Sequence, residues 1–276
     1  MPPVTLVTDS SACLPEQVVA RLPAVAVLPI MIHLESGDIR DGMGEAGPLV
    51  YRALARGETV KSSAPSPLEY LAAIEQSDGD VVVITPATEF TAMYRSAAVA
   101  AEISGPRVSV VDSRTAAAAH GLVVLAAAEV GAAGGTAGEV VRAAEDAGRR
   151  AELVAALDGV DFIKRSGRVP PVALELAHRL GIRPVFRLRA GSVERLGVPR
   201  SLPAALRRIR KEAVADGLTS SSGSFVFHAA APERAEELRT LLGTVGGATE
   251  FSPSMGIHTG PGVVGVAWLR AGPVTS

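Results

Sequence analysis

Short apolar runs alternate along the first 150 residues with longer segments in which apolar positions recur at helical spacing. Four runs are apolar on both faces, which is typical of strands buried in a parallel sheet. These runs cover residues 4–9, 24–34, 80–85 and 107–112. The segments with helical spacing cover residues 14–22, 67–76, 91–103, 116–131 and 136–150. Strands that alternate with helices predict right-handed crossovers and a doubly wound parallel layer.

After residue 150 the pattern indicates hairpins. Two β segments, 183–189 and 192–198, are separated only by Ala190 and Gly191, which is a hairpin signal with a glycine turn. Helices are predicted just after the apolar run 151–157 and at 171–180, 202–215 and 232–242, and strands at 224–229, 248–253 and after the turn at 260–262. This pattern predicts antiparallel pairing. We therefore expect a two-domain α/β protein, with a parallel doubly wound domain at residues 1–150 and a mixed-sheet α/β domain at 151–276.

The composition excludes several classes of protein. Hydrophobic residues make up 47% and charged residues 20% of the 276 positions, which predicts a folded core. A formal charge of −2 argues against a nucleic-acid partner. Apolar runs are too short for stable membrane insertion, and the N-terminus lacks the basic and apolar regions of a signal peptide. Because Cys13 is the only cysteine, we expect a reducing compartment and a cytoplasmic location.

Common cofactor and catalytic motifs are missing from the sequence. There is no G-x-x-x-x-G-K-[ST] phosphate loop and no G-x-G-x-x-G turn, so neither ATP nor a dinucleotide has its usual binding loop. There is no G-x-S-x-G nucleophile elbow, and the histidines and carboxylates show no metal-ligand spacing. We therefore expect no cofactor, no metal site and no catalytic residues in this chain.

Polar residues follow several predicted strands, at the edge where ligands collect in an open α/β sheet. In "TDSS", Asp9 and Ser10 are best explained as helix caps, with a ligand role as the alternative. The segment "KSSAPSP" offers Ser62, Ser63 and Ser66 before a predicted helix. Capping explains one of these serines well, but it explains three of them less well.

Two further loops carry groups suited to an anion. Thr88 and Thr91 enter a predicted helix, where hydroxyls and free backbone donors attract a carboxylate or a phosphate, although a cap and a turn explain them equally well. His258 precedes Thr259 and the glycine turn that starts at Gly260. It is either an ordinary loop residue or a polar group at the mouth of an apolar pocket.

Two arginines stand at positions where the backbone turns. Arg168 follows a glycine in "KRSGRVP", and Arg200 lies between a predicted strand and a predicted helix in "GVPRS". A solvated surface arginine is the ordinary interpretation of each.

The order of these segments resembles the DegV family. The segments that carry the resemblance are "VTLVTDSSACLP", "SSAPS", "TPATEFTAMYRSA", "VVDS", "KRSGRVP", "RPVFRLRAGSV…VPRS" and "HTGPGVVG", and together they span nearly the whole chain. The resemblance implies that a tunnel between two α/β domains encloses one long-chain fatty acid, whose carboxylate lies near the domain interface. It further implies that the bound acid is presented to a separate ATP-dependent fatty acid kinase subunit, which would place the protein in phospholipid metabolism.

Residue by residue, the resemblance assigns roles to the polar loops. The residues that it places on the carboxylate are Ser62, Thr88, Thr91 and His258. The supporting loop residues are Asp9, Ser10, Ser63, Thr259 and Gly260. Arg168 and Arg200 are placed near the transferred phosphate or the partner subunit. In this interpretation, Gly260 and Gly262 let the backbone approach the ligand and aim His258 at the head group.

The sequence also departs from the family pattern. Ala64, Ala92 and Met93 replace the usual Gln, Gly and Thr, and Cys13 stands where a polar residue is common. The changes at Ala92 and Met93 narrow the mouth or alter the pose of the carboxylate. Two other functions stay open on the sequence: a small hydrolase that uses a Ser or Thr near His258, and a lipid-sensing regulatory module.

Overall fold

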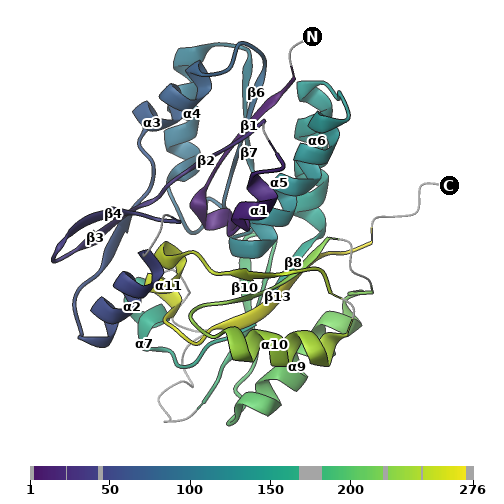
Figure 1. Ribbon diagram of the computed structural model, residues 1–276. Helices are drawn as coiled ribbons and strands as arrows, with labels where there is room; N and C mark the ends of the chain where they lie inside the picture. The colour runs from purple at the N-terminus through teal and green to yellow at the C-terminus, as the bar shows by residue number, and fades with distance from the viewer. Residues whose placement is uncertain are drawn as a thin grey trace.

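The computed structural model describes residues 3–22, 24–42, 46–167, 182–219, 223–243 and 245–271. Its first layer is a four-stranded parallel sheet with the strand order β2-β1-β6-β7. The strands are β1 (Thr5–Asp9), β2 (Val25–Leu28), β6 (Val81–Thr85) and β7 (Val108–Asp112). Helices α3 (Pro67–Glu75) and α4 (Met93–Ser104) cover one face, and α5 (Ala117–Ala132) and α6 (Ala137–Arg150) cover the other (Figure 1). The short helices η1 (Ser10–Ala12) and α1 (Glu16–Val19) follow β1.

The apolar run 24–34 was wrongly predicted as one strand of this sheet. Pro29 and Ile30 separate β2 from β3 (Met31–Leu34), which pairs antiparallel with β4 (Gly37–Arg40) and β5 (Lys61–Ser63) in a small sheet of its own. The break follows from proline, which lacks the N–H that a strand needs to continue its ladder. Helix α2 (Ala46–Ala55), which the pattern did not predict, follows this hairpin and packs on α11 (Pro253–Thr259).

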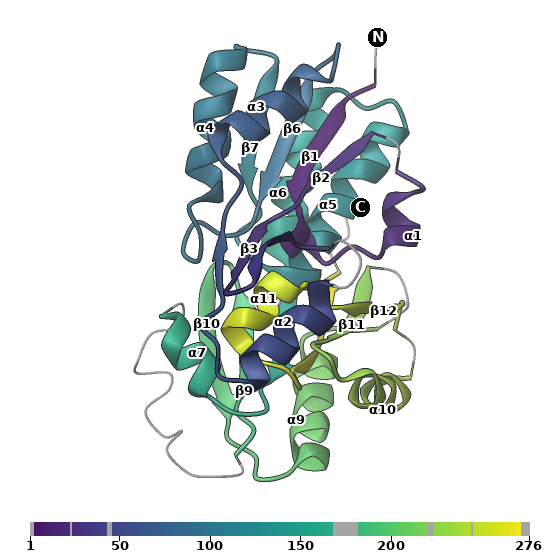
Figure 2. The same cartoon turned by 60° about the vertical axis from the view of Figure 1, so that its left-hand side comes forward.

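The second layer is a six-stranded sheet with the order β10-β9-β8-β13-β11-β12. Its strands are β8 (Ala151–Ala156), β9 (Val185–Arg189), β10 (Ser192–Gly197), β11 (Ser224–His228), β12 (Ala248–Glu250) and β13 (Val264–Leu269). All neighbours pair antiparallel except β11 and β12, so the predicted hairpin and mixed sheet are confirmed. Helices α9 (Leu202–Ala215) and α10 (Pro232–Leu242) cover its outer face, and α7 (Asp161–Ser166) follows β8 (Figure 2). The helix predicted at 171–180 lies outside the described residues.

The α/β class with one parallel and one mixed sheet is thus confirmed. The change of sheet falls between Arg150, the last residue of α6, and Ala151, the first of β8. The division into two domains at this point stays a prediction. Within the described ranges, no helix has the length and apolar character needed to cross a membrane.

Helix α5 lies between the two sheets and contacts strands of both (Figure 1). Its sequence, "AAAHGLVVLAAAEVGA", has no polar face over most of its length, as expected for a helix buried on all sides. Its one buried polar side chain, His120, bonds Thr8 and Ser113 at 3.0 Å each. Burial lowers the pKa of His120 to about 3, so the ring is neutral at pH 7. Side chains from α5 and from both sheets form one continuous hydrophobic core.

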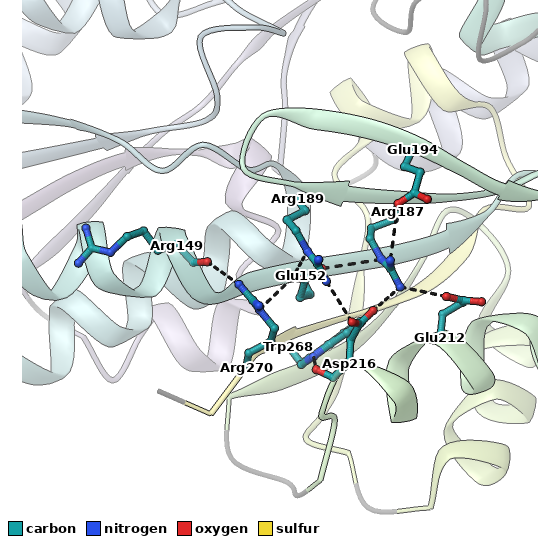
Figure 3. Close-up of polar contacts among 9 residues, drawn as sticks. All are labelled: Arg149, Glu152, Arg187, Arg189, Glu194, Glu212, Asp216, Trp268 and Arg270. Atoms are coloured by element: carbon teal, nitrogen blue, oxygen red, sulfur yellow. Dashed lines mark hydrogen bonds and ion pairs between the residues drawn. The ribbon is translucent and has the colours of Figure 1, made fainter. Parts of the chain in front are cut away.

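The two faces of β9 differ in chemistry. Phe186 and Leu188 point to the same core as α5, whereas Arg187 and Arg189 point to the α9 side. On that side Glu152 of β8 is completely buried among arginines (Figure 3). Glu152 accepts a hydrogen bond from Nε of Arg189 and lies 3.0 Å from Nε of Arg270 and 3.9 Å from Nε of Arg187.

Two carboxylates complete this charge cluster on the α9 side. Arg187 contacts Glu212 of α9 at 3.0 Å and also pairs with Asp216, which follows that helix. Arg189 reaches Asp216 as well, at 3.2 Å. Because each buried charge has a partner of opposite sign, the cluster fixes α9 on the sheet without leaving a charge uncompensated.

We expect Glu152→Leu to lower the free energy of unfolding by about 1–3 kcal/mol, because Arg189 and Arg270 lose the carboxylate that they share, while both guanidinium groups stay partly exposed to water. Urea denaturation followed by circular dichroism measures this loss. The control is Glu194→Ala, since Glu194 is 64% exposed and only approaches Arg187, at 3.6 Å. Its expected effect is below about 0.5 kcal/mol, and equal losses in the two variants would contradict the role of Glu152.

Candidate ligand-binding site

A cavity with a volume of about 210 Å³ lies between the parallel sheet and the six-stranded sheet. Ser11, just after β1, and Pro86, just after β6, contribute to its wall. In the strand order β2-β1-β6-β7, the chain that leaves β1 continues to β2 and the chain that leaves β6 continues to β7. The two connections therefore run toward opposite edges of the sheet. The cavity therefore occupies the switch point of an open α/β sheet, which is where such folds bind ligands.

Polar side chains from three separate elements line the cavity. Oγ of Ser62, on β5, lies 3.2 Å from Nε2 of His258, on α11. Thr91, from the loop between β6 and α4, and Thr259 also line the cavity, and all four residues are partly exposed. We call Ser62, Thr91 and His258 the head-group residues. Three of the four side chains expected at the carboxylate thus lie in the cavity wall, and two of them, Ser62 and His258, are in contact.

Thr88 lies apart from this group. Its hydroxyl donates to Oδ2 of Asp112 at 3.0 Å, and the residue is exposed and outside the cavity wall. Thr91, three residues later, turns the other way, and its Oγ1 accepts from N–H of Met93 at 3.3 Å. One threonine therefore ties the loop to the end of β7, and the other faces the cavity.

His258 lies in a helix, which corrects its expected place in a glycine turn. It belongs to the last turn of α11, which begins at Pro253 and ends at Thr259. Gly260 has φ of +81°, and a Cβ on it would lie 2.4 Å from the ring of Phe162. This glycine therefore makes room for Phe162, and its approach to a ligand stays a prediction.

Three of the supporting residues, Asp9, Ser10 and Ser63, lie at the ends of short elements near the cavity. Asp9 caps η1 by accepting from N–H of Ser11 at 2.9 Å, so the capping interpretation is confirmed. Ser10 donates to Asp41 at 2.7 Å. Ser63 points away from Ser62 and bonds Nε2 of His33 at 3.0 Å. These residues hold the loops in place and do not line the cavity themselves.

The two predicted arginines are placed differently. Arg200 is exposed in the connection between β10 and α9, as expected for a solvated side chain. Arg168 lies outside the described residues, and its predicted role stays a prediction.

Sequence reasoning missed a buried polar cluster next to the head-group residues. Asp41 is 2% exposed and accepts from N–H of Ser254 at 3.2 Å and from its hydroxyl at 2.5 Å. Because Ser254 lies in the first turn of α11 and Ser10 also bonds Asp41, this carboxylate ties that helix to the loop after β1. The signal for this residue is slight: a single Asp at the end of a predicted loop looks like any turn residue.

Most of the remaining cavity wall is apolar. Leu153 and Ala155 of β8, Phe186 and Leu188 of β9, and Phe227 of β11 form its floor. Arg187 also borders the cavity, but its guanidinium pairs with Asp216 on the opposite face of the sheet. Such a cavity suits a molecule with an aliphatic body and one small polar end. In the part of the chain that the structure describes, no group of three or more His, Cys, Asp and Glu side chains is placed to hold a metal ion.

The carboxyl of Asp9 has an unusual protonation equilibrium. Burial raises its pKa to about 6, while hydrogen bonds from Ser11 act in the opposite direction. Its Oδ2 atom is buried without a hydrogen-bond partner. Because the folded pKa lies above the unfolded value, the folded state binds this proton more tightly. The stability that Asp9 contributes is therefore fully present below about pH 4 and is lost as the pH rises through about 6.

The variant Asp9→Asn tests this dependence, because asparagine keeps an oxygen for Ser11 and does not ionise. Between about pH 4 and about pH 6.5, we expect wild type to lose on the order of 2 kcal/mol of unfolding free energy relative to Asp9→Asn. Urea denaturation over this range measures the difference. Asp78→Asn, at an exposed position before β6, is the control and is expected to follow wild type. A pH profile of Asp9→Asn parallel to wild type would contradict the raised pKa.

Comparison with known proteins gives relatives over the whole chain. The family profile described as an uncharacterised protein of the DegV family matches residues 3–271. The DegV domain-containing protein SCO2569 of Streptomyces coelicolor is 32% identical over 273 residues, which cover 95% of this chain and 97% of that protein.

Two solved structures share this fold and also exceed a quarter in sequence identity. A DegV family protein from Thermus thermophilus, described by its fatty acid binding, has a TM-score of 0.88 and 26% identity, over 98% of this chain and 100% of its own. The DegV family protein Cg2579 from Corynebacterium glutamicum has a TM-score of 0.81 and 27% identity, over 99% of each chain. The profile and the relatives confirm the resemblance seen in the sequence: this chain belongs to the DegV family.

Proposed function

We propose that the protein binds a single long-chain fatty acid, with the carboxylate at the head-group residues and the acyl chain over the floor of the cavity. The observation that carries this proposal is a mostly apolar cavity in whose wall the side chains of Ser62 and His258 are in contact. The fatty acid binding described for the Thermus thermophilus relative supports it.

The chemistry of the cavity matches the two parts of such a ligand. Burying about ten methylenes contributes on the order of 8 kcal/mol before ordering costs. This term gives affinity but no direction, and an unpaired buried carboxylate would cancel much of it. In the proposed binding mode, the hydroxyls of Ser62 and Thr91 and the ring of His258, all in the cavity wall, hydrogen-bond the carboxylate. The acid is therefore held in one orientation, without an arginine clamp that would reduce the nucleophilicity of its carboxylate.

We further propose that this carboxylate is presented to a separate ATP-dependent fatty acid kinase subunit. The missing phosphate-binding motif supports a division of labour in which the partner supplies ATP. Exposed Arg200, and Arg168 outside the described residues, are proposed to meet the phosphate or the partner. A cytoplasmic location agrees with the single cysteine, Cys13, which is buried and unpaired.

Native mass spectrometry of the protein purified from a heterologous host tests the binding. We expect one acyl chain per molecule, retained because the cavity excludes water from the tail. Lipid extraction followed by mass measurement identifies the acid. A protein that is reproducibly empty and that also takes up no added fatty acid would refute the proposed function.

Ser62→Ala and Ser63→Ala form a matched pair on adjacent positions of β5. Only Ser62 faces the cavity, so Ser62→Ala is expected to weaken binding of a fatty acid about tenfold or more, since a hydrogen bond to a charged group contributes about 1.5–3 kcal/mol. Binding of the corresponding methyl ester should change less, because its head carries no charge. Displacement of a fluorescent fatty acid measures both affinities. Ser63→Ala should bind as wild type does, and an equal loss in both variants would contradict the role of Ser62.

The contact between Ser62 and His258 also supports a second candidate, a small hydrolase with Ser62 as nucleophile and His258 as base. Their separation of 3.2 Å is at the long end of the range for such a pair. An ester of a fatty acid separates the two functions. Steady turnover of the ester that disappears in Ser62→Ala would favour the hydrolase, whereas binding without turnover favours the lipid-binding function.

A further inference from the structure

We propose that the stacked rings of Phe227 and Phe251 are the end wall of the acyl cavity and set the longest chain that the protein accepts. This inference rests on the proposed function and adds a specificity-determining residue pair to it. The pair lies on a part of the cavity wall that solvent does not reach, since Phe227 is 0% and Phe251 4% exposed. The head-group residues are partly exposed, which makes their side the entrance.

The register of the sheet explains where an acyl chain has room. One row of side chains runs across four neighbouring strands, because Phe186 pairs with Ala155, Ala155 with Gly265 and Gly265 with Phe227. Directly paired residues of antiparallel strands point to the same face. The row therefore has a phenyl ring at each end and two of the smallest side chains between them. This arrangement leaves a trough that ends at Phe227.

Phe227 does not stand upright beside this trough but leans into it. A Cβ added to Gly265 would lie 2.5 Å from Cζ of Phe227, so the tip of the ring occupies the space above that glycine. Glycine at position 265 is what allows the ring to reach across β13. The trough over β8 and β9 is consequently closed on the β11 side by this one ring.

Phe251 keeps the ring of Phe227 in place. The two ring centroids are 5.4 Å apart and the planes differ by 21°, a stacked arrangement. Such pairs contribute about 0.5–1.5 kcal/mol beyond the burial of their surface. Phe90 also lines the cavity but is partly exposed, so it has room to move when a ligand enters. The stacked pair is therefore the fixed boundary, and the side near Phe90 is the one that adapts.

Phe225 provides a matched control for Phe227. It lies two residues earlier on the same face of β11 and packs on the same hydrophobic core. It pairs with Ala267 in the next row of the sheet and is not part of the cavity wall. Truncating either phenylalanine removes the same atoms from the same strand, but only one truncation extends the cavity.

The experiment offers a ladder of saturated fatty acids of increasing length to delipidated protein and identifies the bound acids by native mass spectrometry. For Phe227→Ala, we expect the preferred chain to lengthen by about two to four carbons, because the lost ring leaves a space that the surrounding core fills only partly. Phe225→Ala should keep the wild-type preference. Ala155→Leu fills the trough between the rings and should shift the preference to shorter acids. Phe227→Leu is a smaller change and should also shift the preference to longer acids. It replaces Phe227→Ala in the experiment if the alanine variant does not fold.

The outcomes separate this inference from the proposed function. If wild type takes up acids and a folded Phe227 variant keeps the wild-type length preference, the end wall is refuted while the binding function stands. Equal shifts in the Phe225 and Phe227 variants would also refute it, because the effect would then come from loosening the core. If wild type takes up no acid at all, the proposed function fails and the end wall with it.

Discussion

The complete burial of the first half of α5, residues 117–124, between the two sheets is the constraint on which the rest of the structure depends. A helix in this position must be apolar on all sides and narrow enough for both sheets to approach it. Gly121 shows how closely η1, which follows β1, approaches this helix, since a Cβ at this position would lie 2.3 Å from the carbonyl oxygen of Ala12. The alanines at the start of α5 serve the same purpose, and Ala116 and Ala117 also form part of the cavity wall. The helix thus joins the two layers into one core and leaves a hollow where its first turn begins.

The polar groups around this hollow are supported by a second layer of buried contacts. Ser62 lies on β5 and His258 on α11, almost two hundred positions apart in the chain. They meet because Asp41 ties the first turn of α11 to the loop after β1. A buried carboxylate is stable only when all of its hydroxyl and backbone hydrogen-bond donors are in place. The hydrogen bonds that satisfy Asp41 therefore also fix the position of α11, the helix that carries His258.

The six-stranded sheet shows how one element performs two tasks. The alternation of β9 places Arg187 on the side of α9 and Phe186 on the side of the cavity. The charge cluster around Glu152 holds the strands and α9 in register on one face. The other face is free to carry small and large apolar residues in the order that shapes the trough. A rigid sheet of this kind makes the shape of the cavity floor a fixed property of the fold.

The sequence by itself determined the order and type of most elements, because hydrophobic period and turn residues act locally: the hairpin at Ala190 and Gly191 is an example. It also marked Ser62, Thr91 and His258 through the family resemblance. It did not separate β2 from β3, and it placed His258 in a turn instead of a helix. Only the tertiary structure decided that Thr88 turns toward Asp112, that Asp41 supports α11 and that Gly265 lies beneath Phe227. These features depend on contacts between residues distant in the chain, and local pattern carries no information about which distant residues meet.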